Sequence, residues 1–223
     1  MTTEIRVLDS EDDLIAAANV FRVAMIGFPP LPDLPPGQIT RLLEPGRTVG
    51  AFVEGQLVGT VDATSGGLTL PGGAIVGHAT VTHIGVLPSF TRKGIATELI
   101  HHQLHDIAAR GEVVATLRAS EATIYERYGY GAASSSQSVE VLPARAALRP
   151  DVGAGGPVRL LEATEAWDVL PRIYAGAADA SRGWPTSPGW YWAMRTRAAH
   201  TPSGGWPGVG QCPPESRGLP SAQ

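Results

Sequence analysis

The sequence predicts a mixed α/β fold in which a mostly antiparallel sheet is flanked by helices. Hydrophobic residues alternate with a period of two over residues 48–63 and 78–86, as expected of half-buried strands. They follow a helical period over 11–26 and 94–110, and a strand–helix–strand order returns later in the chain. The chain has 223 residues, of which 43% are hydrophobic and 17% charged, so it can bury a sizeable core.

The first part of the chain predicts a strand, a helix and an extended loop. Residues 5–8 are a short apolar run suited to a strand, and Ser10 offers the N-cap of a helix over 11–26. Five prolines within residues 28–37 exclude a helix or a central strand there, because proline lacks a backbone N–H. We therefore expect a stiff loop at this point, followed by a short helix over 38–44.

The pattern then changes to alternation. Residues 48–54 and 56–63 predict an antiparallel hairpin that turns at Glu54 and Gly55. The remaining predicted elements are, in order, turns at Gly66–Gly67 and 71–73, a strand over 78–86, a helix over 94–110 closed by Gly111, a strand over 113–117, a two-turn helix over 121–128 stopped by Gly129, and a strand over 135–142.

Composition excludes several classes of function. The net charge is −4 and Lys93 is the sole lysine, which argues against nucleic acid as a partner. No run of eighteen apolar residues is present, so no membrane span is expected, and the N-terminus does not resemble a signal peptide. Cys212, the single cysteine, excludes an internal disulfide framework and a cysteine-built zinc site. We expect a cytoplasmic protein, with a second copy of the chain as a candidate partner.

A strand–loop–helix joint between Val86 and Ala96 has features of an anion site. The first amides of a helix have no partners inside it, and the helix dipole favours negative charge there. Gly94 and Ala96 are small enough for a phosphate to approach those amides, and Arg92 and Lys93 add two cations. On spacing alone, an ordinary joint with incidental basic residues explains the segment equally well.

Two motifs carry a resemblance to a known superfamily. Thr91-x-x-Gly94-x-Ala96 resembles motif A of the GCN5-related N-acetyltransferase (GNAT) superfamily, which usually reads Arg/Gln-x-x-Gly-x-Gly/Ala. Residues 119–131, Ala-Ser-Glu-Ala-Thr-Ile-Tyr-Glu-Arg-Tyr-Gly-Tyr-Gly, resemble a stretch of the enhanced-intracellular-survival (Eis) type of acetyltransferase. The likeness covers most of residues 4–142 and extends weakly to about 197. A GNAT-type sheet followed by the start of a second GNAT-like domain is the fold that this resemblance implies.

The resemblance implies acetyl-CoA as co-substrate, a primary amine as acceptor and no metal. The matching positions are Ile84, Gly85 and Val86 for the strand edge that pairs with the pantetheine arm, Arg92, Lys93, Gly94, Ile95 and Ala96 for the pyrophosphate loop, Ser120 for a further coenzyme contact, and Tyr125 for the acid that protonates the departing thiolate. Thr91 departs from the usual Arg or Gln, so one pyrophosphate hydrogen bond is expected to be weaker. Direct attack by the amine needs no protein nucleophile, so Cys212 has no expected role.

Three tyrosines and one histidine are candidates for the catalytic groups. The motif match favours Tyr125, whereas Tyr128 occupies a position usually filled by Phe and Tyr130 is a candidate lid; packing roles for all three are the alternative. His83 should point to the face opposite Ile84, on the strand that abuts the acetyl group. With an ordinary pKa of about 6.5 it could act as a general base, and a partly buried structural histidine is the alternative.

The proline-rich loop is the candidate acceptor site. Asp33 is its only charged residue and Phe28 lies at its start, so that an acidic group rimmed by apolar side chains could bind a cationic amine. The alternative is that the loop only packs over the sheet. His101 and His105 are four residues apart on the predicted long helix, a spacing that could hold a metal. Without a third ligand, we expect exposed helix residues.

We expect four segments: an acetyltransferase domain (1–142), a linker (143–157), an incomplete second GNAT-like domain (158–197) with a short helix at 189–197, and a disordered or out-of-frame tail (198–223). Residues 158–167 repeat the apolar–Arg–apolar–apolar–acidic pattern of 5–14, which indicates the start of a second, similar domain. In the Eis type the base is the C-terminal carboxylate of a later domain. The resemblance therefore leaves an alternative to an active acetyltransferase, namely a catalytically weak or inactive CoA-binding remnant.

Overall fold

The computed structural model describes residues 2–26, 28–29, 31, 33–119, 121–134, 139–142, 144, 146–147, 149–153 and 155–180. Its helices and strands are, in chain order, β1 (Glu4–Leu8), α1 (Glu11–Ala24), α2 (Ile39–Leu42), β2 (Thr48–Val53), β3 (Gln56–Thr69), β4 (Ile75–Val86), α3 (Ile95–Ala109), β5 (Val114–Leu117) and α4 (Ala163–Ala180). Short 3₁₀ turns lie at Pro88–Phe90, Ala122–Ile124 and Glu126–Tyr128.

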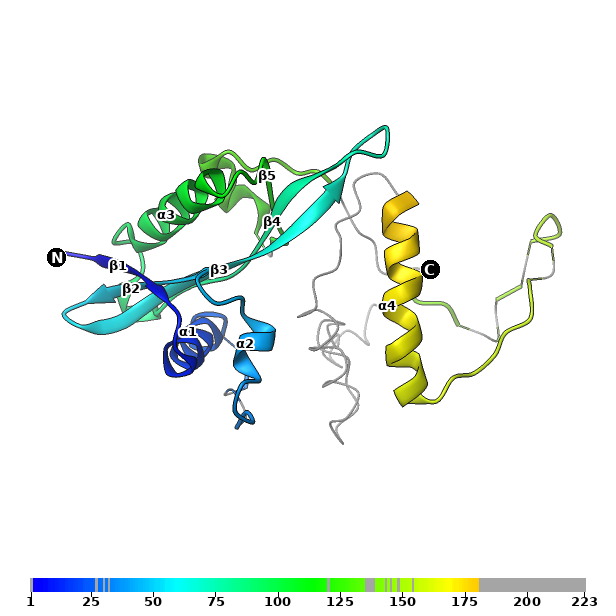
Figure 1. Ribbon diagram of the computed structural model, residues 1–223, viewed down its shortest axis with the longest axis horizontal. Coiled ribbons are helices and arrows are strands. Elements are labelled where there is room, and N and C mark those ends of the chain that lie inside the picture. Colours follow the sequence, from blue (N-terminus) through cyan, green and yellow to red (C-terminus); the bar gives the residue numbers. More distant parts are fainter. Residues whose placement is uncertain are drawn as a thin grey trace, which may run out of the picture.

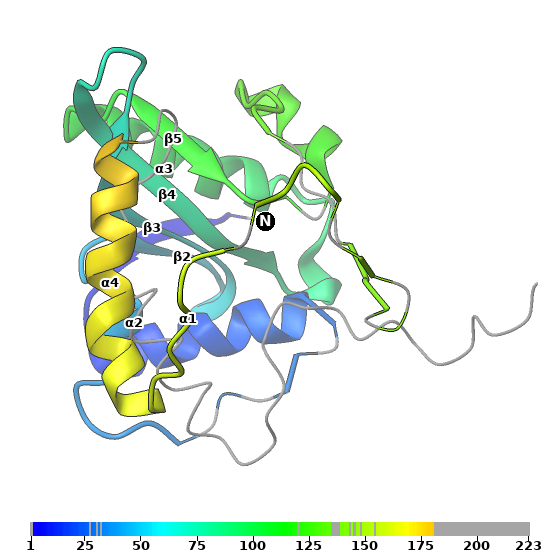
Figure 2. The ribbon, with the colours of Figure 1, turned by 90° about the vertical axis from the view of Figure 1, so that its right-hand side faces the viewer.

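The strands form one sheet in the order β1-β2-β3-β4-β5. Each neighbouring pair is antiparallel except β4 and β5, which are parallel. Figure 1 shows α3 above the sheet and α1 with α2 below it, and Figure 2 shows the same layers turned by 90°. The mixed, mostly antiparallel sheet flanked by helices confirms the predicted fold.

Each face of the sheet covers a hydrophobic core. The larger cluster joins α3 to the central strands and contains Val49, Ala51, Val53, Val58, Val61, Ala63, Ala79, Val81, Ile95, Leu99 and Ile107. The smaller cluster joins α1 and α2 to the sheet through Leu8, Leu14, Ala17, Ile39, Leu43 and Phe52. Leu31 and Leu34 of the proline-rich loop pack against this smaller cluster, so the loop does help to cover that face.

The helix ends follow the signals in the sequence. The Ser10 side chain accepts a hydrogen bond from the backbone N–H of Asp13 at 3.1 Å, which caps α1. Gly111 follows the end of α3 with a φ of +75°, a left-handed conformation that favours glycine.

Three sequence predictions about local structure are wrong. Gly66 and Gly67 form no turn but lie inside β3, paired with His78 and Gly77. Residues 121–128 form two 3₁₀ turns rather than a helix. The predicted strand over 135–142 is absent from its described part, 139–142, which is irregular and exposed. No described strand pairs with these residues, and a lone strand leaves its backbone N–H and C=O groups without partners.

The segment predicted to begin a second domain (158–197) is described only up to residue 180. It contains one helix, α4, whereas residues 158–162 form no strand, and Val158 and Leu160 are 92% and 94% exposed. Figure 1 shows α4 apart from the three layers. The predicted helix at 189–197, the tail and Cys212 lie outside the described residues. Among the described helices, none is long and apolar enough to cross a membrane.

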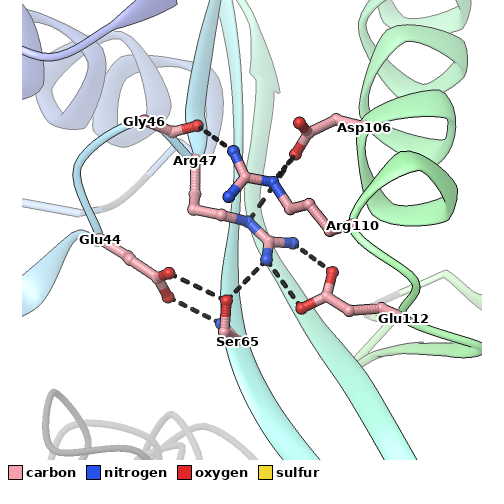
Figure 3. Close-up of polar contacts among 7 residues, drawn as sticks. All are labelled: Glu44, Gly46, Arg47, Ser65, Asp106, Arg110 and Glu112. Carbon is pink, nitrogen blue, oxygen red and sulfur yellow. Dashed lines mark hydrogen bonds and ion pairs between the residues drawn. The ribbon is translucent and has the colours of Figure 1, made fainter.

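A buried arginine joins the start of β2 to the end of α3 (Figure 3). Arg47 is 2% exposed, and it donates from Nη1 and Nη2 to the two carboxylate oxygens of Glu112 at 2.7 and 2.8 Å. Nη1 also donates to Ser65 at 2.7 Å, and Ser65 in turn bonds Glu44. Arg110 pairs with Asp106 at 2.7 Å beside this cluster. The network fixes α3 against the sheet.

Candidate acetyltransferase site

One edge of β4 is open at its C-terminal end. The pairing with β5 runs from His78 opposite Val114 to Val81 opposite Leu117 and stops there. In the part of the chain that the structure describes, no strand pairs with residues 82–86 on that side. The backbone groups on this edge can therefore pair with an extended ligand lying between the two strands.

A bulge interrupts the other side of the same segment. Thr60 of β3 pairs with Gly85, and Asp62 pairs with Thr82. Val61 therefore opposes both His83 and Ile84, which is one extra residue in β4. His83 takes up this extra residue with a φ of +48°, a left-handed conformation that is uncommon outside glycine.

The bulge brings His83 against a buried carboxylate. His83 Nδ1 lies 2.9 Å from Asp62 Oδ1, and the Asp62 side chain is 2% exposed while that of His83 is 33% exposed. The Phe21 ring of α1 also meets the imidazole edge to face, with 4.7 Å between ring centroids. A carboxylate and an aromatic ring thus both contact the His83 side chain.

The pKa of His83 is raised above its ordinary value. Burial by itself lowers this pKa, but the charge of Asp62 and its hydrogen bond raise it by more, and Arg22 opposes them with a smaller effect. Sequence reasoning named His83 and missed both Asp62 and Phe21. The alternation of β3 could have shown that Asp62 is an acid on a buried strand, but its pairing with His83 depends on the bulge.

Ile84 and Val86 lie on the opposite face, as the sequence predicts. Both pack against the cluster that contains Ile95 and Leu99 of α3. At Gly85, a Cβ atom would lie 2.9 Å from the Cβ of Ala24 and 3.2 Å from the Cα of Phe21. Glycine at this position therefore lets α1 approach the strand closely.

The loop before α3 is exposed, and it leaves the N-terminus of the helix without a side-chain cap. Residues 91–94 are all exposed. Arg92 and Gly94 have φ values of +59° and +85°, and no side chain caps α3. Lys93 Nζ donates to the Ser89 carbonyl at 3.2 Å, whereas the Arg92 guanidinium has no ion-pair partner among the described residues. The first amides of Ile95 and Ala96 thus face an open, basic surface.

A hydrogen bond links this helix to the tyrosine motif. Thr97 Oγ1 and the Tyr128 hydroxyl oxygen are 3.0 Å apart, and the Tyr128 and His101 rings meet edge to face with 5.9 Å between centroids. Tyr125 lies at the junction of two 3₁₀ turns, where its carbonyl accepts from the backbone N–H of Tyr128 at 3.0 Å. Tyr128 therefore packs the motif onto α3 and leaves Tyr125 half-buried beside it.

Burial raises the pKa of both remaining tyrosines. For Tyr125 the charge of Tyr128 adds to the effect of burial, and for Tyr130 burial and the charge of Tyr125 raise the pKa to about 12. The two rings meet edge to face with 6.2 Å between centroids. The Tyr130 hydroxyl is buried with no hydrogen-bond partner within the described residues. Both phenols thus stay protonated at neutral pH, as a general acid requires.

The remaining predicted site residues are placed as follows. Phe28 is 51% exposed and lies beside Phe21, with 5.8 Å between ring centroids, so it adjoins the His83 side of the site. Asp33 is exposed, and no contact joins it to His83 in the described structure. Ser120 lies outside the described residues. His101 and His105 are exposed, and no group of three metal-binding side chains occurs within the described ranges.

These features define the class of protein. Three features together form the GNAT fold: the sheet order, the parallel β4–β5 pair whose pairing ends at Val81, and the helix α3 between these two strands, which begins after Gly94. Residues 4–133 match the acetyltransferase (GNAT) domain family, and the chain belongs to that family.

Individual relatives agree with this assignment. The chain is 41% identical over 137 residues to an uncharacterised N-acetyltransferase of Streptomyces coelicolor, covering 60% of this chain and 33% of that protein. It is 33% identical over 111 residues to the N-acetyltransferase Eis of Mycobacterium tuberculosis, covering 48% of this chain and 28% of that one. The crystal structure of Eis1 from Mycobacterium abscessus superposes with a TM-score of 0.76 at 46% identity, covering 89% of this chain and 49% of that one. Each match thus spans less than half of the other protein.

Proposed function

We propose that this domain transfers an acetyl group from acetyl-CoA to a primary amine of an aminoglycoside-like polyamine or a lysine side chain. The observation that carries the proposal is the Thr97–Tyr128 hydrogen bond, which joins the open N-terminus of α3 to the segment that bears Tyr125. The segment that bears Tyr125 therefore lies against the first turn of α3, whose N-terminal amides we propose to bind the pyrophosphate.

The residues present fit the coenzyme. A Cβ atom added at Gly94, which has a φ of +85°, would have no atom within 4 Å. The space in front of the first amides of α3 is therefore free. Ile95, Ala96, Arg92 and Lys93 would hold the pyrophosphate, and the backbone of Ile84, Gly85 and Val86 would pair with the pantetheine arm. Acetyl-CoA supplies the acetyl group as a thioester, and the cytoplasm is the compartment that we propose for the reaction.

Two side chains take the proton-transfer roles in this proposal. Tyr125 donates a proton to the coenzyme sulfur, because its raised pKa keeps the hydroxyl protonated at neutral pH. His83 accepts a proton from the amine on the α1 face of β4. Phe28 is exposed beside this face, and we propose that it contacts the apolar part of the acceptor, with Asp33 attracting its positive charge.

Turnover with an amine panel tests the proposal. Purified chain would be mixed with acetyl-CoA and an aminoglycoside, a linear polyamine or a lysine peptide, and release of free thiol would be followed. Amine-dependent thiol release supports the proposal. Coenzyme binding by calorimetry without turnover would instead identify a CoA-binding module, and absence of both would contradict either reading.

A further inference from the structure

The contact between Asp62 and His83 has a role beyond joining two strands. We propose that Asp62 is a positioning residue, which holds the His83 imidazole with its Nδ1–H toward the carboxylate and so leaves Nε2 to accept the proton of the acceptor amine. This inference rests on the proposed function, because it assigns the proton acceptor of that same reaction.

Asp62 is a buried acid with an unpaired carboxylate oxygen. The Asp62 side chain is only 2% exposed to solvent. Its Oδ2 atom is buried with no hydrogen-bond partner among the described residues. Its neighbour across the strands, Thr48, also has a buried hydroxyl without a described partner. Burying a carboxylate with a single partner costs several kcal/mol of stability, so its presence here points to a role in function.

The His83 ring presents its Nδ1 atom to Asp62. His83 Nδ1 lies at 2.9 Å from Asp62 Oδ1, and because a carboxylate can only accept, Nδ1 must carry the hydrogen. The neutral ring then has its lone pair on Nε2. The Nε2 atom is not buried without a hydrogen-bond partner, and one third of the His83 side chain is exposed. Phe21 fixes the ring plane from α1, so the ring keeps this orientation.

Two charged side chains act on the His83 ring. Asp62 approaches from β3 and favours the protonated imidazole, while Arg22 approaches from α1 and disfavours it. In the transfer step, Nε2 takes the proton that the amine loses as the new N–C bond forms. Tyr125 gives a proton to the sulfur as the C–S bond breaks. The His83 imidazolium then passes its proton through solvent to the Tyr125 phenolate, so both side chains return to their starting states.

A double-mutant pH profile with ring-nitrogen NMR tests the inference. The variants are Asp62→Asn, His83→Gln and the double variant, with the exposed-acid change Asp12→Asn as matched control. In the parent, kcat should fall on the acid side with a midpoint above 6.5, the ordinary pKa of histidine. Asp62→Asn should move that midpoint to lower pH and reduce the plateau roughly 10²-fold, within the usual range for general base catalysis. In the His83→Gln background, Asp62→Asn should cause no further loss of kcat.

The NMR measurement gives a readout that is independent of turnover. The nitrogen shifts of His83 above its pKa should report the Nδ1–H tautomer in the parent and lose it in Asp62→Asn. His78, whose Nε2 lies 2.7 Å from Thr116 Oγ1, is the internal control and should not change.

Three outcomes would overturn the inference. They are an Nε2–H tautomer in the parent, an unshifted acid limb in Asp62→Asn, or an equal further loss of rate in the His83→Gln background. Each of them, found with an active parent, leaves the acetyltransferase proposal intact. A parent that turns over no amine fails the proposed function, and the inference fails with it.

Discussion

Arg47 and Glu112 form a two-armed ion pair with distances of 2.7 and 2.8 Å between the guanidinium nitrogens and the carboxylate oxygens. The Arg47 side chain is fully buried and that of Glu112 is 9% exposed. Arg47 Nε has no hydrogen-bond partner within the described residues, although Asp106 Oδ2 lies 3.9 Å away. The pair connects the residue that precedes β2 to the turn after α3.

Removal of one partner should destabilise the fold strongly. Arg47→Met leaves the Glu112 carboxylate without its partner, and we expect a loss of about 3–5 kcal/mol in the free energy of unfolding, measured with urea. Arg149→Met removes an exposed pair with Asp151 and should cost less than about 1 kcal/mol. Arg47→Met combined with Glu112→Leu should recover part of the loss. Equal urea midpoints for the two single arginine variants would show that the buried pair contributes nothing.

Gly94→Val should weaken coenzyme binding by about 10-fold or more. A β-branched side chain is strained at a φ of +85° and would cover the first amides of α3. Loss of even one hydrogen bond to a charged phosphate corresponds to about 10-fold in the dissociation constant, which calorimetry with acetyl-CoA would measure. Gly111→Val is the matched control, since Gly111 ends the same helix at a φ of +75° with equally open surroundings. Unchanged affinity in Gly94→Val would show that the anion site is elsewhere.

Arg92→Ala should weaken coenzyme binding in a salt-dependent way. Its exposed guanidinium adds an attraction for phosphate that dissolved salt screens, because the Debye length is about 10 Å at 0.1 M salt. We expect a loss of roughly 10-fold at low salt and a clearly smaller loss at high salt. Arg6→Ala, on β1 at the far edge of the sheet, should leave the affinity unchanged at either salt concentration. A loss that is independent of salt would argue against a charge effect.

Tyr125→Phe should reduce turnover and leave coenzyme affinity nearly unchanged. General acid catalysis typically contributes about 10²–10⁴-fold, and we expect the lower end because a thiolate is already a good leaving group. The measurement is kcat with a fixed amine beside the dissociation constant for acetyl-CoA. Undiminished kcat would mean that another group, or water, protonates the sulfur.

Tyr130→Phe is the contrasting change in the same cluster. The Tyr130 hydroxyl is buried and has no partner among the described residues, so its removal relieves the cost of an unsatisfied polar group, about 1–3 kcal/mol. We expect a raised melting temperature and an unchanged kcat. A fall in kcat comparable to that of Tyr125→Phe would show that the Tyr130 hydroxyl also takes part in turnover.

Two histidines on β4 should give opposite dependences of stability on pH. The pKa of His83 is raised by Asp62, so its stabilising effect is complete below its unfolded pKa and is lost as pH rises through its folded pKa. Burial lowers the pKa of His78 and Glu112 opposes this, so its stabilising effect is present above its unfolded pKa and is lost as pH falls through its folded pKa. Urea unfolding from about pH 5 to 8 should therefore show His83→Gln most destabilised in acid and His78→Gln most destabilised near pH 8. Parallel pH profiles for the two variants would contradict this.

Much of the fold was accessible from local patterns. The helical period of α3, the Ser10 cap of α1 and the alternation of β2 and β4 all predicted elements that the structure contains. Local patterns failed where pairing partners decide. Gly66 and Gly67 look like a turn, yet their backbone groups are satisfied by β4, so β3 continues through them. Residues 139–142 alternate like a strand and remain irregular because no described strand pairs with them.

The sequence by itself determined the order of most helices and strands, the loop and glycine before α3, and the tyrosine motif, because these depend on residues close together in the chain. Only the tertiary structure decided which distant residues meet. Asp62 reaches His83 because one extra residue in β4 turns that imidazole toward β3, and Tyr128 reaches Thr97 because the 3₁₀ turns fold back onto α3. Register and bulge position depend on the packing of the whole sheet, which a linear pattern does not contain.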